Sequence, residues 1–260
     1  MKIAVITGAS SGMGRQAAIQ IGDQLGGIQE IWLIARRGQR LEELQGRMPT
    51  GVRCFAMDIT LQEDRKRFAH ILSEEKPDVK ILVNAAGFGK IGKAEDLDTE
   101  SQQEMVRLNC QALCAMTSMV LPYMSNNSRI IQFASSAAFL PQPKFAVYAA
   151  TKAFVLSYSR ALGAELKRRN IYVTAVCPGP VKTEFFDIAE KTGEIPVYKR
   201  LVMADAKKVV RKALRDSYMG KSVSVYGVTM KAFHVLCRTV PHSWLLEIMT
   251  LLDRDLCSRR

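Results

Sequence analysis

The amino-acid sequence predicts a doubly wound α/β fold, in which helices cover both faces of a parallel sheet. Two observations predict this fold class. Short runs of apolar, mainly β-branched residues alternate along the chain with longer segments of helical character. Each short run is apolar almost throughout, which is typical of strands that are buried on both faces. In such a fold the ligand site is expected at the carboxyl ends of the strands.

The expected strands are, in chain order, residues 2–6, 30–35, 52–57, 81–84, 129–134 and 172–176. The expected helices are residues 14–25, 62–74, 100–123 and 148–168. The first strand is a β-branched run that ends at a glycine-rich turn, where a helix can begin. Each later strand is a further apolar run, and the helices fill the intervals between strands. The last helix is expected because the segment from Ala146 to Leu166 contains no proline and carries apolar residues at helical spacing.

The composition is that of a globular protein with a sizeable core. The chain has 260 residues, of which 48% are hydrophobic and 24% charged, and one domain is the simplest division. The formal net charge of +12 is compatible with nucleic acid, an anionic membrane surface or a phosphorylated small ligand as a partner. The charges are dispersed and form no basic tail, so nucleic acid is not expected.

Cysteine and histidine usage predicts no metal site. The six cysteines form no C-x-x-C pair, and none of the three histidines lies at metal-ligand spacing from a cysteine, except loosely His234 from Cys237. Dispersed cysteines are typical of reduced thiols in a cytoplasmic protein. The N-terminal apolar run is too short for the hydrophobic region of a signal peptide, which also favours the cytoplasm.

A tyrosine and a lysine on the last helix are the strongest chemical signal. Tyr148 and Lys152 lie four residues apart, and therefore one turn apart on the same helix face. A positive charge beside a phenol favours the phenolate, so the pKa of Tyr148 is expected to be lowered and the residue to act as a proton donor or acceptor. Ser135, at the end of a strand, could hold the oxygen of a carbonyl or alcohol. Taken alone, such a pair is more often a surface pair, and Ser-Ser after a strand is more often a turn.

The turn between the first strand and the first helix is rich in glycine. Glycines there allow a tight turn and let a pyrophosphate approach the amide groups of the helix N-terminus, where the helix dipole favours anions. A dinucleotide is the expected ligand, and a plain glycine turn is the alternative. The expected contacts in this stretch are Gly8, Ser10, Ser11, Gly12, Met13 and Gly14.

Several motifs in fixed order resemble the classical short-chain dehydrogenases/reductases, over about residues 1–230. They are Thr7-Gly-x-x-x-Gly-x-Gly14, Asn84-Ala-Ala-Gly87, Asn109, Ser135, Tyr148-x-x-x-Lys152 and Pro178-Gly-Pro180. The resemblance implies a Rossmann fold and a catalytic set of Asn109, Ser135, Tyr148 and Lys152. In that set Ser135 would orient the substrate oxygen, Tyr148 would exchange the proton, and Lys152 would also bind the nicotinamide ribose. Asn109 would hold a water that continues a proton relay from the lysine.

The resemblance also implies cofactor contacts outside the glycine turn. Asp58 and Ile59 would contact the adenine, and the stretch from Asn84 to Gly87 would line the adenine-ribose side. Val181 and Thr183 would meet the nicotinamide carboxamide or a phosphate. The full set comprises Asp58, Ile59, Asn84, Ala85, Gly87, Tyr148, Lys152, Pro178, Gly179, Val181 and Thr183.

The residues after the second strand predict the choice of cofactor. Proteins that use NAD commonly place an acidic residue there, whereas this chain has Arg36 and Arg37. Two guanidinium groups could hold a 2′-phosphate, which favours NADP(H) over NAD(H). The alternative is a solvated basic loop.

The substrate is expected to be a hydrophobic carbonyl or alcohol, such as a steroid or a lipid-derived ketone. The resemblance places a substrate lid at about residues 184–203, within a dinucleotide-binding and catalytic domain of residues 1–227. Apolar residues in and near the lid suggest an apolar pocket, although they could equally be core. They are Phe88, Phe139, Leu140, Pro141, Phe185, Phe186, Ile188 and Tyr198.

Residues 228–260 are expected to form amphipathic helices around Pro241. These helices could cover the pocket, join subunits or lie on an anionic membrane, and are too short to span a bilayer. The resemblance further implies a homodimer or homotetramer.

The sequence thus predicts an NADP(H)-dependent oxidoreductase that interconverts a ketone or aldehyde and an alcohol. Three alternatives stay open: an NAD-linked alcohol dehydrogenase, a nucleotide-binding redox sensor without turnover, and a protein that acts at a membrane surface.

Overall fold

The computed structural model describes residues 1–24, 26–185 and 203–257. Its centre is a sheet of seven parallel strands in the order β3-β2-β1-β4-β5-β6-β7. The strands are β1 Lys2–Thr7, β2 Glu30–Ala35, β3 Gly51–Ala56, β4 Asp78–Asn84, β5 Arg129–Phe133, β6 Tyr172–Val176 and β7 Val223–Ser224. The strand order reverses direction between β1 and β4, so the predicted doubly wound fold is confirmed.

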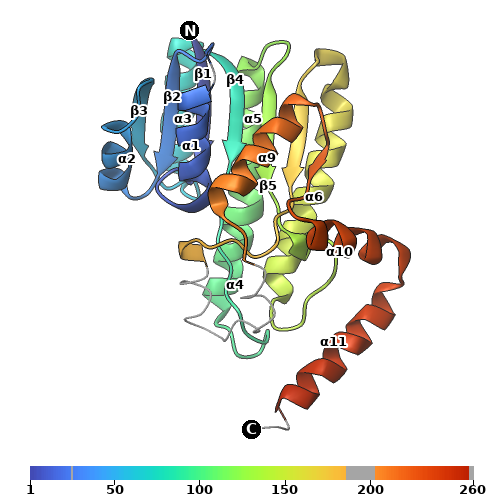
Figure 1. The fold of residues 1–260 in the computed structure, drawn as a ribbon. Coiled ribbons are helices and arrows are strands. Elements are labelled where there is room, and N and C mark those ends of the chain that lie inside the picture. The colour runs from blue at the N-terminus through green and yellow to red at the C-terminus, as the bar shows by residue number, and fades with distance from the viewer. Residues whose placement is uncertain (25, 186–202, 258–260) are drawn as a thin grey trace.

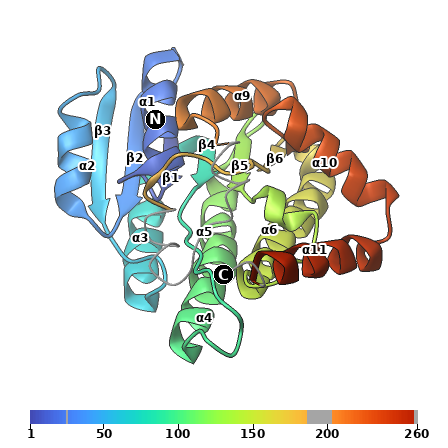
Figure 2. The same ribbon diagram turned by 60° about the horizontal axis from the view of Figure 1, so that its bottom comes forward.

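Helices cover both faces of this sheet, as Figures 1 and 2 show. They are α1 Gly12–Gln24, α2 Gly38–Gln45, α3 Gln62–Glu75, α4 Thr99–Val106, α5 Leu113–Val120, α6 Ala146–Glu165, α9 Ala206–Tyr218, α10 Val228–Thr239 and α11 His242–Cys257. Short 3₁₀ turns occur at Leu121–Tyr123, Ser136–Ala138 and Leu166–Arg169. None of the helices in the described ranges combines the length and hydrophobicity that crossing a membrane requires.

The two faces of the sheet build separate cores because neighbouring strand residues point in opposite directions. In β1, Ile3 and Val5 pack with residues of α3, α5 and α6, whereas Ala4 and Ile6 pack with residues of α1, α2 and α9. All four of these side chains are fully buried. The predicted strands are apolar throughout because side chains on both faces of the sheet are buried.

Three elements of the described part of the chain are absent from the sequence prediction. The strand β7 has only two residues and leaves almost no pattern. Helix α2 is short, and α9 lies in a strongly basic stretch, although its apolar residues Val209, Val210, Ala213 and Leu214 are buried at helical spacing. At the N-terminus of α9 the carboxylate of Asp205 accepts a hydrogen bond from the Lys208 amide at 3.0 Å.

The long helix predicted at residues 100–123 is present, but it is not a regular α-helix throughout. Its middle, Arg107–Ala112, is a π-helical turn between α4 and α5. Such turns bulge a helix locally and are frequent at functional sites. Asn109 lies in this turn, so the departure from regular helix coincides with a predicted site residue.

The C-terminal helices predicted around Pro241 are present as α10 and α11. Phe233 and Met230 of α10 and Leu245 and Met249 of α11 pack against a cluster formed with α6 and β6. Figure 1 shows α11 continuing away from the sheet after α10. Most of the predicted lid, including Phe186, Ile188 and Tyr198, lies outside the described residues.

Candidate active site

The glycine turn after β1 is shaped by three glycines that no other residue can replace without strain. Gly8 and Gly12 have φ values of +69° and +53°, in the left-handed region that favours glycine. A Cβ on Gly8 would lie 2.6 Å from the amide nitrogen of Ala86, and one on Gly14 would collide with the Gly8 carbonyl. The turn therefore packs tightly against the segment after β4 and leaves the N-terminus of α1 uncovered.

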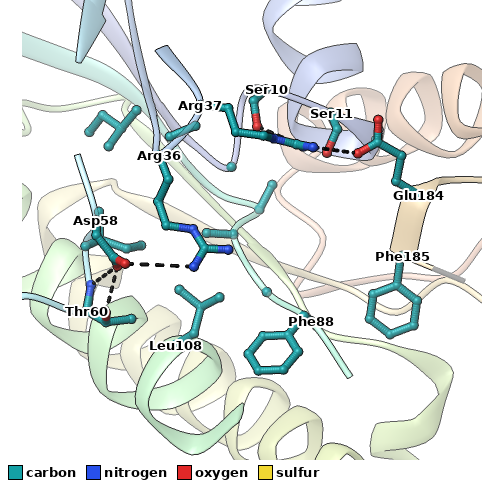
Figure 3. Close-up of a pocket in the computed structure, with 18 of the residues that line it drawn as sticks. Ser10, Ser11, Arg36, Arg37, Asp58, Thr60, Phe88, Leu108, Glu184 and Phe185 are labelled. Atoms are coloured by element: carbon teal, nitrogen blue, oxygen red, sulfur yellow. Dashed lines mark hydrogen bonds and ion pairs between the residues drawn. The ribbon is translucent and has the colours of Figure 1, made fainter. Parts of the chain in front are cut away.

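This turn forms one wall of a cavity of about 340 Å³ at the carboxyl ends of the strands. The other walls are the segments that follow β2, β3 and β4, the end of α4 with the π-helical turn, and Thr183 to Phe185 (Figure 3). Predicted cofactor contacts that line the cavity are Gly8, Ser10, Ser11, Gly12, Met13, Arg36, Arg37, Asp58, Ile59, Ala85, Gly87 and Thr183. Amide groups at a helix N-terminus, small residues and two arginines are the donor set that a phosphorylated dinucleotide needs, so the residues present fit such a ligand.

The two arginines have acidic partners in the structure. Arg36 is largely exposed and its Nη1 lies 3.9 Å from the Asp58 carboxylate. Arg37 donates from Nη1 to the Glu184 carboxylate at 3.0 Å and from Nη2 to the Ser10 hydroxyl at 3.3 Å (Figure 3). Glu184 also accepts a hydrogen bond from Arg40.

The pKa of Glu184 follows from these contacts. Burial alone would raise it, but the hydrogen bonds from Arg40 and Arg37 outweigh burial and lower the pKa. Glu184 is therefore ionised at neutral pH and neutralises part of the positive charge of the cavity. The sequence predicts Glu184 only as the first residue of a lid, because ion pairs across 147 residues leave no local signal.

Ser135 and Tyr148 are hydrogen-bonded to each other, although they come from different elements. Ser135 follows β5, and its hydroxyl accepts a hydrogen bond from the Ala137 amide at 3.1 Å. Tyr148, in the first turns of α6, is buried, and its side chain forms a hydrogen bond with Ser135. The two predicted catalytic hydroxyls are thus adjacent at the carboxyl end of β5.

Lys152 lies behind the tyrosine. Its Nζ donates to the Phe133 carbonyl oxygen at 2.8 Å and lies 5.6 Å from the centre of the Tyr148 ring. Burial lowers the pKa of Lys152 to about 8, although nearby Cys110 and Cys177 act in the opposite direction. The ammonium therefore stays largely charged at neutral pH and loses its proton in mildly alkaline solution.

The expected direction of the tyrosine pKa shift is wrong for this structure. Burial raises the pKa of Tyr148 to about 12, and the hydrogen bond with Ser135 offsets only part of this rise. The lysine ammonium donates to a backbone carbonyl and lies 5.6 Å from the centre of the phenol ring, and among the described residues it forms no hydrogen bond with the phenol. Tyr148 is therefore a neutral phenol at neutral pH, a state from which a proton can be donated.

Asn109 is fully buried and fixed by the backbone after β4. Its Nδ2 donates to the Phe88 carbonyl at 2.9 Å and to the Thr151 hydroxyl at 3.1 Å, and its Oδ1 accepts from the Phe88 amide at 3.1 Å. The π-helical turn presents this side chain between α6 and the cavity wall. Thr151, which the sequence analysis did not single out, couples Asn109 to α6 because its hydroxyl also donates to the Tyr148 carbonyl at 2.7 Å.

Gly87 makes room between Asn109 and Lys152. A Cβ on Gly87 would lie 2.9 Å from Asn109 Oδ1 and 3.3 Å from Lys152 Nζ. The absence of a side chain there keeps open the space that faces both groups. This is the place where a water could connect the lysine to the asparagine.

The remaining predicted contacts support the walls of the site. Asn84 is buried in the sheet and donates to the Thr117 hydroxyl and the Gln132 side chain, each at 3.0 Å. Pro178 accepts a hydrogen bond from the Ser136 amide at 2.8 Å, which ties the loop after β6 to Ser135. Val181 is buried, and Gly179 lies so close to Met230 of α10 that a Cβ would be 2.6 Å from its sulfur.

The apolar residues near the tyrosine divide into two groups. Phe145 stacks on Tyr148 with ring centres 4.2 Å apart, and Phe185 lies 5.3 Å from it. Phe88 packs in the same cluster. Phe139 and Leu140, by contrast, are buried in a different cluster beneath α10, so the core alternative is confirmed for these two residues.

Gly89 was also missed by the sequence analysis. A Cβ there would lie 2.6 Å from the Tyr148 ring. No sequence pattern predicts this close approach, because it depends on how the loop after β4 crosses α6.

Within the part of the chain that the structure describes, no three His, Cys, Asp or Glu side chains are grouped to hold a metal ion.

Comparison with known proteins places this geometry in context. A family model described as short chain dehydrogenase matches residues 2–193. An uncharacterized oxidoreductase of Staphylococcus epidermidis is 32% identical over 184 residues, in a match that covers 70% of this chain and 79% of that protein. A very-long-chain 3-oxoacyl-CoA reductase of Aspergillus oryzae is 28% identical over 248 residues, covering 90% of this chain and 69% of that one.

Solved structures show the same architecture. A short-chain dehydrogenase from Sphingobium yanoikuyae in complex with NADPH has a TM-score of 0.77 at 26% identity, and the match covers 99% of this chain and 95% of that chain. Other similar structures are complexes with NADP+ or with NADH. The similar structures thus support a nicotinamide dinucleotide and include both the phosphorylated and the unphosphorylated kind.

Proposed function

Because the chain belongs to the short-chain dehydrogenase/reductase family, we propose that this oxidoreductase uses NADPH to reduce the carbonyl group of a hydrophobic, lipid-like or steroid-like substrate. The observation that carries the proposal is the hydrogen-bonded pair of Ser135 and Tyr148 beside a cavity lined by glycines and arginines. A protein with a purely structural role would need neither the pair of Ser135 and Tyr148 nor this cavity.

In this proposal Tyr148 acts as the proton donor. The cofactor, held by the glycine turn and the two arginines, supplies a hydride when it is bound. The Ser135 hydroxyl donates a hydrogen bond to the substrate oxygen and holds it beside the Tyr148 hydroxyl, where charge develops during reduction. Tyr148 transfers its proton to that oxygen, and the nearby Lys152 ammonium stabilises the phenolate that remains.

The raised pKa of Tyr148 fits the role of proton donor at neutral pH. A phenol with a pKa of about 12 is almost completely protonated at pH 7 and is ready to donate. Oxidation of an alcohol would need the phenolate, which burial disfavours. Asn109 and the space beside Gly87 provide the route by which the proton of Tyr148 is replaced through a water and Lys152.

The choice of NADPH rests on the arginines after β2. Two guanidinium groups at the cavity mouth match a 2′-phosphate, and the nearby acids, Asp58 and Glu184, are each already paired with an arginine. An NAD-linked alcohol dehydrogenase of the same family is the second candidate, because complexes with NADH occur among the similar structures.

The substrate class rests on the apolar surroundings of Tyr148. Phe88, Phe145 and Phe185 pack around the tyrosine and leave a mainly apolar approach to the hydroxyls. The similarity to a very-long-chain 3-oxoacyl-CoA reductase supports a ketone that carries a long apolar group. The assembly proposed with this function is a homodimer or homotetramer in the cytoplasm.

Turnover on a graded panel of ketones tests the proposal. The purified protein is mixed with NADPH or NADH and with 3-oxoacyl thioesters of increasing chain length, steroid ketones and sugar carbonyls, and oxidation of the nucleotide is followed by absorbance. The proposal predicts turnover with NADPH that becomes more efficient as the apolar chain grows. Tight NADPH binding without turnover on any compound would favour a redox sensor, and equal efficiency with NADH would favour the second candidate.

A further inference from the structure

A second groove lies beside Ala138 and Phe139, in the segment that follows Ser135. It has a volume of about 570 Å³ and shares no lining residue with the cofactor cavity. Its walls come from Ala138 and Phe139, α6, the start of β7, α10 and the first residue of α11. The floor is apolar and includes Phe139, Leu156 and Val223.

Cations from three elements meet at this groove. They are Arg160 of α6, Lys221 before β7 and Arg238 of α10. Of the described residues that line the groove, none is acidic. Lys221 is partly neutralised by Asp216, whose carboxylate lies 3.0 Å from its Nζ, but Asp216 also accepts from Lys212 at 2.7 Å. Arg160 and Arg238 form no ion pair with a described carboxylate.

Two histidines complete the rim. His234 stacks on Phe139 with ring centres 4.2 Å apart, and His242 donates from Nε2 to the Cys237 carbonyl at 3.1 Å. Burial lowers the pKa of His234, and the positive charges of Arg238 and Arg160 lower it further. Both guanidinium groups line the same groove as this imidazole.

We propose that this groove is a binding site for a phosphate monoester that carries an apolar or aromatic group. Bringing three cations together costs repulsion unless an anion is present, and a phosphate can accept charge-assisted hydrogen bonds from several of them at once. The apolar floor beneath the cations favours a ligand with an uncharged body. The site is separate from the proposed reaction and does not depend on it.

Phenyl phosphate is the probe, and the three histidines of the chain report where it binds. NADPH is kept saturating, so that the arginines of the cofactor cavity are occupied. In ¹H–¹³C spectra the signals of His234 and His242 are expected to shift saturably, while that of His70, on α3, stays in place. Arg160→Gln and Arg238→Gln should each weaken binding by about tenfold or more, because each removes a charged hydrogen bond.

Arg47→Gln is the matched control. Arg47 is an exposed arginine after α2, at the opposite edge of the sheet, so its loss changes the net charge equally without touching the groove. Equal weakening by all three variants, or equal shifts of all three histidines, would overturn the proposal, because either result would indicate attraction to the overall positive charge.

The phosphate could belong to a soluble ester or to a lipid headgroup. Sedimentation with vesicles that contain phosphatidic acid distinguishes these sources. If the protein co-sediments with these vesicles, and Arg160→Gln reduces co-sedimentation while Arg47→Gln leaves it unchanged, the phosphate belongs to a lipid headgroup. Histidine shifts without co-sedimentation would identify a soluble ester.

Discussion

Replacement of Glu184 by glutamine should make the protein bind NADPH more tightly. The carboxylate of Glu184 occupies the guanidinium of Arg37, with 3.0 Å between Nη1 and Oε2, and side chains that are 45% and 40% exposed. A pair this exposed is worth about 0.2–1 kcal/mol. The 2′-phosphate of NADPH must displace it, so its removal should lower the dissociation constant for NADPH by about 1.5- to 5-fold.

NADH lacks the 2′-phosphate, and its affinity should stay the same in the Glu184→Gln variant. The assay is a fluorescence titration of both nucleotides at constant ionic strength. Glu75→Gln is the matched control, because it removes a similarly exposed ion pair, with Arg53, far from the cavity. Arg37→Ala is the opposing variant and should weaken NADPH by about tenfold or more, since charged hydrogen bonds are worth about 1.5–3 kcal/mol. Equal changes for NADPH and NADH, or weaker NADPH binding in Glu184→Gln, would refute the assignment of Arg37 to the phosphate.

Three further predictions concern the catalytic groups and the core. Gly87→Ala should lower kcat at least about tenfold while the protein stays folded, because the new Cβ would lie 2.9 Å from Asn109 Oδ1. The control is Gly26→Ala, because nothing lies within 4 Å of a Cβ at that position. An equal kcat in both variants would contradict the role given to the space beside Gly87. The rate of carbonyl reduction should fall as the pH rises through about 8, where Lys152 loses its proton. The Lys152→Arg variant should lose this inflection. A wild-type rate that stays constant from pH 7 to pH 9 would contradict the claim that the charge of Lys152 supports the reaction. Asp216→Asn should lower the free energy of unfolding in urea by about 1–3 kcal/mol, because the side chain is only 3% exposed and accepts from two lysines and Ser224. Burial alone would raise the pKa of Asp216, but these hydrogen bonds lower it, so the difference from wild type should persist above the usual aspartate range and shrink as the pH falls below it. A difference that stays constant below that range would contradict the ionic origin.

The fold could be predicted from the sequence because its signals are local. The strands β2 and β6 begin and end where the apolar runs predict, and the glycine turn follows β1 as expected. The short strand β7 could not be predicted, since it depends on pairing with β6 across a long separation in sequence. The π-helical turn around Asn109 was missed for a similar reason: the side chain is held by the backbone of Phe88, 21 residues away.

The composition of the site could be predicted, but its electrostatics could not. Ser135, Tyr148, Lys152 and Asn109 gather at one end of the sheet, as the motif order indicates. Helical spacing alone suggested that Lys152 would lower the pKa of Tyr148. Burial reverses that direction, and burial is a property of the whole fold. The pairing of Arg37 with Glu184 is likewise a long-range contact that no local pattern records.

The proton-donor role of Tyr148 is the central claim, and the most direct test is single-turnover reduction by the Tyr148→Phe variant. The phenylalanine keeps the stacking with Phe145 and removes only the hydroxyl that bonds Ser135. NADPH affinity and the melting temperature should stay close to wild type, while the rate of ketone reduction should fall by at least about a hundredfold. Reduction at the wild-type rate by a folded Tyr148→Phe protein that binds NADPH would contradict the account.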